Sequence, residues 1–451
     1  MRSYVASTLL FFLHVLRYNT EGRVISSTNI ETLQIANVIF RHGSRSPLAS
    51  YYKDPYNTTL YWHDGPGQLT KEGKQQEYEL GQYLKWRYMG FIDTSYHTSE
   101  VYTQSSDIDR AIMSGELVLA GLFPPNADHS DSMWNPSVNW QPIPLHTISS
   151  TEDNKIAYAV NCPRFERLFY DYLHSPEMEP TNKKYEYMYK YLSEHSQTNI
   201  SDVVKSTTLY DTLYIQELHN LTLPTWAKNY YPEKLKEAAK DLWTIIVAQK
   251  EMKRLRGGPL VGDIMLNIER LVNENSRRKY RNPKAKLYLY SGHDSTIATF
   301  LGTLDVFDRQ IPPYSSAVIF ELHKEKDTES KPGDYFIEIH FRNETDRPPY
   351  KLEIPNCGNP CKLENFKSLY KDVIIYDWGI WVHDCQSKST FISTAATEAF
   401  FSEIDTAGIM MLLSIFIIGM VVTGVIFLTV VLPQQQRKLK SAKESFEMKT
   451  V

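Results

Sequence analysis

Residues 407–432 form an apolar run without a charged side chain, in which Ile, Val, Leu, Met and Phe predominate. At about 1.5 Å per residue, a helix of this run is roughly 39 Å long and can cross a bilayer. Glu403 and Asp405 precede the run, whereas several Lys and Arg residues follow it. The positive-inside rule therefore predicts a single-pass type I membrane protein with a cytoplasmic tail at 433–451. The pattern does not distinguish a lysosomal from a cell-surface destination.

A second apolar run, from Val5 to Leu16, follows Arg2 at the N-terminus. Because this run is too short to span a bilayer and is interrupted by His14, it is typical of a secretory signal peptide. We place the signal peptide at 1–22, and a buried N-terminal helix is the alternative interpretation. The folded part of the chain is then expected in the lumen or outside the cell.

Four cysteines lie between the two apolar runs, at Cys162, Cys357, Cys361 and Cys385. On this oxidising side of the membrane, disulfides are the natural interpretation, and four cysteines allow three pairings that their spacing does not distinguish. A zinc site is the rival interpretation, but no His pair lies at ligand spacing near a cysteine, so no metal or other cofactor is expected. Glycosylation sequons lie on the same side, at Asn57, Asn199, Asn220 and Asn343.

The composition excludes one class of partner. The chain has 451 residues, a net charge of -4 and Lys and Arg that are scattered along it. Without a long basic stripe, electrostatic capture of nucleic acid has little basis. With 42% hydrophobic residues the chain can bury a substantial core.

Strand and helix patterns alternate in the first part of the folded region. Ile35–Phe40 is a short β-branched run that fits a strand buried on both faces. Residues 70–89 contain no Pro and favour a helix, and a further strand is expected at Val101–Thr103. Ser106–Asp109 has the spacing of a capping box, which predicts that a helix follows and that Arg110 lies in its first turn.

Residues 151–258 are polar, rich in Tyr, Leu and Lys, and contain no convincing strand, so we predict a helical insertion there. Strand character returns at Lys286–Tyr290, and the runs at 317–322 and 335–341 resemble a hairpin. The sequence therefore predicts an α/β fold with a mainly parallel sheet, flanking helices and a helical cap. The α/β domain would comprise 23–150 and 259–390, followed by a juxtamembrane stalk at 391–406.

The segment after the first strand carries the strongest chemical signal. Arg41-His42-Gly43-Ser44-Arg45-Ser46-Pro47 puts an imidazole between two guanidiniums directly after the strand. Planar guanidiniums match phosphate oxygens in a forked geometry, and their charge lowers the pKa of a nearby histidine. A neutral His42 in a phosphate pocket is a candidate nucleophile for phosphoryl transfer.

The strand expected at 286–290 is immediately followed by Ser291-Gly292-His293-Asp294, which contains a second polar pair, His293 and Asp294. In open α/β sheets, ligands bind beyond the carboxyl ends of the strands, so this pair is expected across from His42. Asp294 is the candidate acid that protonates the departing alkoxide. Because an aspartate keeps its proton only in acid, an acidic pH optimum follows.

At these residues the chain resembles the histidine acid phosphatase family, a branch of the histidine phosphatase superfamily with a phosphoglycerate-mutase-like fold. The resemblance covers nearly the whole ectodomain. It extends to the stretches Gly67–Thr70, Ser106–Arg110, Leu122–Pro125, Trp140–Pro144, Asn161–Phe165 and Ser291–Asp294.

The resemblance implies an acid phosphatase that forms a phosphohistidine on His42, with Asp294 as the proton donor. It also implies phosphate binding by Arg41, Arg45, Arg110 and His293. Cys357 would pair with Cys361 and Cys162 with Cys385, and small phosphomonoesters would be the substrates. A homodimer is plausible by the same resemblance.

Two other kinds of protein compete with this interpretation. One is a catalytically silent relative that serves as a surface receptor, against which the intact Arg41, His42 and Asp294 argue. The other is an enzyme of the same superfamily with different substrates, such as an inositol polyphosphate phosphatase or a mutase-like transferase. The sequence does not identify the natural substrate.

Overall fold

A mixed β-sheet forms the centre of the computed structural model, which describes residues 29–386 except 59, 127–129, 159, 273–284, 327–333 and 346. The order of its strands is β3-β2-β4-β1-β5-β6-β7, and β8 also pairs with β6. The strands are β1 (Leu33–Arg41), β2 (Val101–Ser106), β3 (His146–Ile148), β4 (Leu287–Gly292), β5 (Ala317–Lys324), β6 (Tyr335–Arg342), β7 (Tyr350–Leu352) and β8 (Cys361–Lys362).

The sheet is parallel in one half only, so the expectation of a mainly parallel sheet is wrong. Strands β3, β2, β4 and β1 are parallel neighbours, whereas β5, β6, β7 and β8 pair antiparallel. The connection from Lys324 to Tyr335 is shorter than the dozen or so residues that a parallel crossover needs. The predicted hairpin of β5 and β6 is therefore confirmed, and it makes this half antiparallel.

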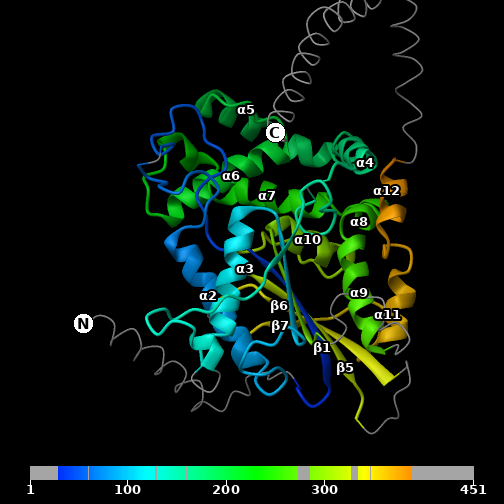
Figure 1. The fold of residues 1–451 in the computed structure, drawn as a ribbon. Coiled ribbons are helices and arrows are strands. Elements are labelled where there is room, and N and C mark those ends of the chain that lie inside the picture. The colour runs from blue at the N-terminus through cyan, green and yellow to red at the C-terminus, as the bar shows by residue number, and fades with distance from the viewer. Residues whose placement is uncertain are drawn as a thin grey trace, which may run out of the picture. The chain divides into compact units, whose positions relative to one another are not determined.

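Helices cover both faces of the sheet (Figure 1). On one face, α2 (Lys71–Arg87) and α3 (Asp109–Leu122) share a core with β1, β4 and β5. On the other face, α9 (Gly258–Val272), α10 (Asp294–Thr303) and α11 (Leu363–Tyr370) form a larger core with the same strands. The strand β1 is buried on both sides, as its apolar run predicts.

The starts of α2 and α3 differ from one another. The hydroxyl of Thr70 accepts a hydrogen bond from the Gly73 amide at 3.2 Å and caps α2, close to the predicted start. The helix α3 is present, but the predicted capping box is wrong because Ser106 is the last residue of β2 and Ile108 occupies the cap position. The Ser106 hydroxyl instead contacts the ring of His293.

The described residues between β3 and β4 form helices and turns without a strand, as their polar texture predicts. These helices have a core of their own, built around Tyr185, Leu192, Leu213 and Leu235. Figure 1 shows α5, α6 and α7 above one end of the sheet. The helices between β3 and α9 are α4 (Pro163–Leu173), α5 (Glu179–Ser196), α6 (Val203–Leu218), η2 (Thr225–Asn229), α7 (Glu233–Ile245) and α8 (Lys250–Arg256). The remaining two are η1 (Ser130–Met133) and α12 (Trp378–Gln386).

Both disulfides implied by the resemblance are present. Cys162 at the start of α4 pairs with Cys385 in α12, and Cys357 pairs with Cys361. Of the sequon asparagines, Asn57, Asn199 and Asn220 are exposed. Asn343 is half-buried, and its side-chain amide donates to Gln310 Oε1 at 3.1 Å.

The predicted signal peptide at 1–22, stalk at 391–406, membrane span at 407–432 and tail at 433–451 lie outside the described residues. Within the part of the chain that is described, no helix combines the length and the apolar character needed to span a bilayer.

Candidate active site

The two polar pairs predicted at strand ends lie side by side. Strands β1 and β4 are parallel neighbours in which Arg41 is in register with Gly292. The His42 amide donates to the Gly292 carbonyl at 2.9 Å, and the His42 and His293 ring centroids are 5.4 Å apart. The parallel register thus brings together residues that are about 250 positions apart in the sequence.

His42 is buried, with 1% of its surface exposed. Its Nδ1 lies 2.9 Å from the carbonyl oxygen of Gly43, and because a carbonyl can only accept, Nδ1 carries the proton. The lone pair is then on Nε2, which is the form that a nucleophilic imidazole needs. Burial, followed by the charges of Arg41, His293 and Arg45, holds the pKa of His42 well below its usual value. Burial and these charges therefore favour the neutral form of the imidazole.

Two glycines allow the loop that carries His42 to pack closely on α2. A Cβ atom on Gly43 would lie 2.3 Å from the Gly73 carbonyl oxygen, and a Cβ atom on Gly73 would lie 2.0 Å from that of Ser44. Neither position leaves room for a side chain. The close contact positions the residues of the Arg41–Pro47 motif against the start of α2.

Three arginines surround His42. Arg41 Nη2 lies 2.7 Å from Asp294 Oδ2, and Arg45 binds both carboxylate oxygens of Asp211 at 3.0 and 3.2 Å. Burial and then the charge of Arg45 lower the pKa of Arg110 to about 10, so it still carries its charge. Two carboxylates thus face three guanidiniums, which leaves a surplus of positive charge.

The same three guanidiniums have spare donors. The Nε atoms of Arg41, Arg45 and Arg110 are buried and have no hydrogen-bond partner among the described residues. Buried donors without partners are rare in proteins, and an arginine fork is suited to phosphate oxygens. The surplus charge and the free donors together fit an anion.

His293 and Asp294 complete the cluster. His293 Nε2 lies 2.9 Å from the Ser106 hydroxyl, and burial, followed by the charge of Arg110, lowers the pKa of His293 to about 3. Burial raises the pKa of Asp294, but the cations Arg41 and Arg45 outweigh burial and hold this pKa below its usual value. In the absence of an anion, Asp294 is therefore ionised and paired with Arg41.

The comparisons with known proteins identify the family. The model of the histidine phosphatase superfamily (branch 2) matches residues 32–342, which is more than half of the chain. Lysosomal acid phosphatase of Homo sapiens is 37% identical over 372 residues, which cover 81% of this chain and 83% of the human protein. Prostatic acid phosphatase of Homo sapiens is 38% identical over 378 residues, which cover 83% and 92%. The chain belongs to the histidine phosphatase superfamily.

Two solved structures share the fold at low identity. A Hafnia alvei phytase in complex with tartrate has a TM-score of 0.56 at 15% identity, and the match covers 79% of this chain and 99% of the phytase. A Citrobacter braakii phytase has a TM-score of 0.52 at 17% identity, covering 79% and 100%. At these identities the likeness concerns the fold alone.

Three further residues that touch the site were not predicted as site residues from the sequence. Asp211 reaches Arg45 from α6, and the Ser106 hydroxyl contacts His293. The ring of Tyr314 lies 4.0 Å from the Arg41 guanidinium, and its buried hydroxyl has no hydrogen-bond partner within the described part of the chain. Tyr314 lies three residues before the start of β5, and a Pro-Pro-Tyr sequence ahead of a strand is the only hint that could have pointed to it.

Proposed function

We propose that this protein is an acid phosphatase that hydrolyses phosphate monoesters through a phosphohistidine on His42. One observation carries the proposal: a buried, neutral imidazole with its Nε2 lone pair available, enclosed by three guanidiniums that have unused donors. Relatives named lysosomal and prostatic acid phosphatase support the same activity. Phosphoryl transfer is catalysed mainly by positioning and charge stabilisation, which such a cluster supplies.

In the first step, Arg41, Arg45, Arg110 and His293 bind the phosphoryl oxygens, and His42 Nε2 attacks phosphorus. The bond to the ester oxygen breaks, and the Asp294 carboxyl group gives its proton to the leaving alkoxide. In the second step, a water molecule gives a proton to the Asp294 carboxylate and attacks phosphorus. The bond from phosphorus to Nε2 breaks, inorganic phosphate leaves, and His42 and protonated Asp294 are restored.

The ion pair between Arg41 and Asp294 explains how an acid optimum can arise. Arg41 favours the carboxylate of Asp294, whereas the first step needs the protonated acid. A bound phosphate group competes for the Arg41 guanidinium and adds negative charge beside Asp294, and both effects raise the pKa of Asp294. Substrate binding in acid thereby favours the protonated form.

We further place the enzyme on the lumenal or extracellular side of a membrane, with 1–22 as a signal peptide and 407–432 as the anchor. The two disulfides support an oxidising compartment. We assign 23–150 and 259–390 to the catalytic domain and 151–258 to its helical cap. Analytical ultracentrifugation tests the homodimer that the resemblance implies.

The test is hydrolysis of p-nitrophenyl phosphate from about pH 4 to about pH 8 without added metal, by the protein and its His42→Ala variant. We expect turnover that is greatest in acid and absent from the variant. A phosphoenzyme that is stable in alkali and labile in acid should be trapped only in the parent protein. His174→Ala, which removes a histidine next to the exposed Tyr170, is the control. A correctly folded parent protein without turnover would overturn the proposal and favour a binding protein.

A further inference from the structure

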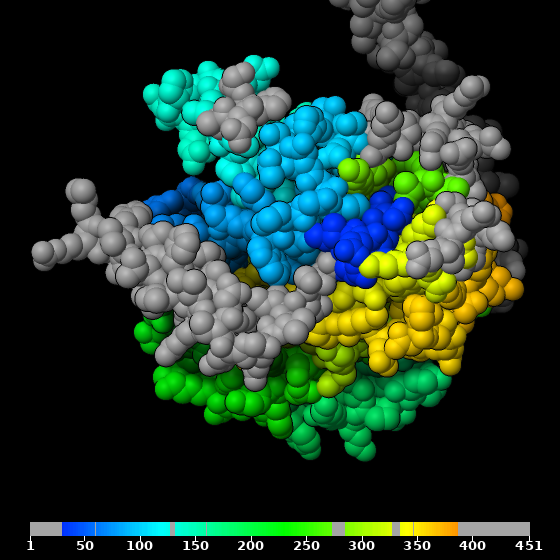
Figure 2. Space-filling view, turned by 90° about the horizontal axis from the view of Figure 1, so that it is seen from below, coloured from blue at the N-terminus to red at the C-terminus, as the bar shows by residue number. Residues whose placement is uncertain are grey.

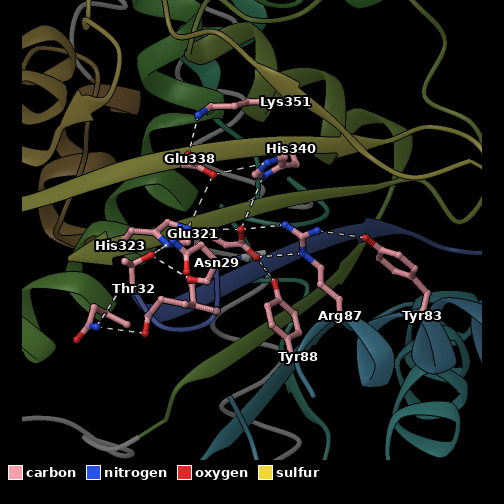
Figure 3. Close-up of polar contacts among 12 residues, drawn as sticks. Asn29, Thr32, Tyr83, Arg87, Tyr88, Glu321, His323, Glu338, His340 and Lys351 are labelled. Carbon is pink, nitrogen blue, oxygen red and sulfur yellow. Dashed lines mark hydrogen bonds and ion pairs between the residues drawn. The ribbon is translucent and has the colours of Figure 1, made fainter. Parts of the chain in front are cut away.

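Two carboxylates and two imidazoles meet on the α2 face of β5 and β6, and we call this group the β5–β6 cluster (Figure 3). Glu321 and Glu338 are cross-strand partners. His323 and His340 lie two positions from them on the same strands and therefore on the same face. Ala36 near the start of β1 pairs with Glu321, whereas His42 follows the other end of β1. The cluster is thus separate from the candidate active site.

Figure 2 views this end of the molecule, where the start of β1 lies beside the β5–β6 hairpin. Although the cluster is near this surface, most of it is buried. Glu321 is 0% exposed, His323 1% and His340 5%, whereas the Glu338 side chain is 25% exposed. One edge of the cluster is therefore open to solvent through Glu338.

The hydrogen bonds of Thr32 determine which nitrogen of His323 carries a proton. The Thr32 hydroxyl donates to the Asn29 carbonyl at 3.0 Å, so its oxygen accepts from His323 Nδ1, also at 3.0 Å. In the neutral imidazole, Nε2 then has only a lone pair. Nε2 is buried without a hydrogen-bond partner among the described residues, and it lies 3.7 Å from Glu321 Oε2 and 4.0 Å from Glu338 Oε2.

In His340, too, a ring nitrogen that carries no proton faces a carboxylate. Its Nδ1 lies 3.7 Å from Glu321 Oε2, and its Nε2 lies 3.7 Å from Glu338 Oε2. A neutral imidazole has one N–H group, so in either tautomer one nitrogen directs a lone pair at a carboxylate. Lone pairs of both histidines are thus directed at the two carboxylates.

We propose that the β5–β6 cluster is a binding site for one divalent transition-metal ion of the Zn²⁺ type. One ligand atom each from Glu321, Glu338 and His340 lies within 4.8 Å of the others, and His323 Nε2 faces the same two carboxylate oxygens. In a tetrahedral zinc site with bonds of about 2.0–2.2 Å, ligand atoms are roughly 3.3–3.6 Å apart. Small side-chain shifts therefore suffice. Mixed imidazole and carboxylate ligands favour zinc over calcium or magnesium.

The surroundings have two features of a metal site. The Nδ1–H group of His323 donates to Thr32, the kind of outer contact that orients a metal-binding imidazole. Arg87 and the Tyr88 hydroxyl hold the Glu321 carboxylate, with Arg87 Nη2 at 2.9 Å from Oε2 and Tyr88 at 2.9 Å from Oε1. These contacts fix Glu321 and leave it able to share Oε2 with an ion.

Lys351 is the competitor for the ion. Its Nζ lies 2.7 Å from Glu338 Oε1, and together with Arg87 it balances the charge of the two carboxylates. Lys351 lies on β7 with 44% of its side chain exposed, so it can turn into solvent at little cost. Metal binding then exchanges the ammonium group of Lys351 for the ion at Glu338.

The test is titration of the metal-free full-length protein with Zn²⁺ near neutral pH, by competition with a chromophoric chelator. The His42→Ala background is used so that the active-site imidazole does not contribute. We expect one equivalent of zinc per chain, and Glu338→Gln should raise the Kd at least about tenfold. Lys351→Met should lower the Kd about two- to fivefold, because it removes a competing surface ion pair.

His97→Gln is the matched control, because it removes an exposed imidazole that also lies 3.7 Å from a carboxylate, that of Asp93. It should leave the Kd unchanged. Absence of stoichiometric binding, or weaker binding in Lys351→Met, would overturn the proposal. A midpoint of thermal unfolding that responds to pH but not to Zn²⁺ would also overturn it, because the cluster would then take up protons only. None of these measurements depends on phosphatase activity, so the proposed function can fail without affecting them.

Discussion

The Arg41→Gln substitution is expected to move the pH profile of hydrolysis upward. Arg41 Nη2 lies 2.7 Å from Asp294 Oδ2, and Arg41 is the largest of the charges that lower the pKa of Asp294 against the effect of burial. An arginine beside an aspartate lowers its pKa by about 1–3 units. Without this cation, Asp294 keeps its proton to higher pH. The descending limb of kcat/KM, which reports the free protein, should therefore move up by about 1–3 pH units.

The assay is the pH dependence of kcat/KM for p-nitrophenyl phosphate, whose own second ionisation is the same for every variant. The rate should also fall by about 10²–10³-fold, as when one donor to a transition state is lost. Arg110→Gln is the matched control, because Arg110 is not among the main charges that lower the Asp294 pKa. It should weaken phosphate binding and move the limb less than Arg41→Gln does, because the interaction of Arg110 with Asp294 is weaker than that of Arg41. An unmoved limb in Arg41→Gln, or equal shifts in both variants, would refute the reasoning.

Three further predictions concern single side chains. Asp294→Asn should slow phosphoryl transfer about 10²–10⁴-fold, and more for alkyl than for p-nitrophenyl esters; equal losses would contradict its role as the acid. Tyr314→Phe should raise the Ki of vanadate at least about tenfold, because the buried Tyr314 hydroxyl, with a pKa of about 12, stays protonated and can donate to a bound anion. Tyr189→Phe, which also removes a buried hydroxyl, should leave the Ki unchanged. Arg87→Met should lower the free energy of unfolding, measured by urea denaturation, by about 3–5 kcal/mol at neutral pH and by less near pH 2. The pKa of Glu321 is lowered to about 2, and the stabilisation by the ion pair is lost as the pH falls towards that value. Equal losses at both pH values would be inconsistent with this.

The candidate site could largely be anticipated because its main groups are local to strand ends. Arg41 and His42 follow one apolar run, and His293 and Asp294 follow another. The carboxyl ends of parallel neighbours lie at one edge of a sheet, so two local patterns sufficed to predict that these residues meet. The position of Arg110 near the start of α3 was likewise predictable, although the expected cap residue was not.

Asp211 could not be anticipated, because it lies in α6, within the predicted helical insertion, and no sequence motif marks it as a site residue. Its role follows from the packing of α6 above the sheet, which brings its carboxylate to both terminal nitrogens of Arg45. The share of parallel pairing in the whole sheet was also misjudged, because apolar alternation reports burial and does not report the direction of a neighbouring strand.

By itself, the sequence determined which chemical groups this protein has and which of them follow strands, because motifs and apolar runs are local properties. It also limited the chain to an α/β fold with a helical insertion. Only the tertiary structure decided which charges neutralise one another, as in the pairs of Arg41 with Asp294 and Arg45 with Asp211. The β5–β6 cluster likewise depends on strand register and on the side chains that α2 and β7 bring to it. Such contacts join residues far apart in the chain, so no local pattern encodes them.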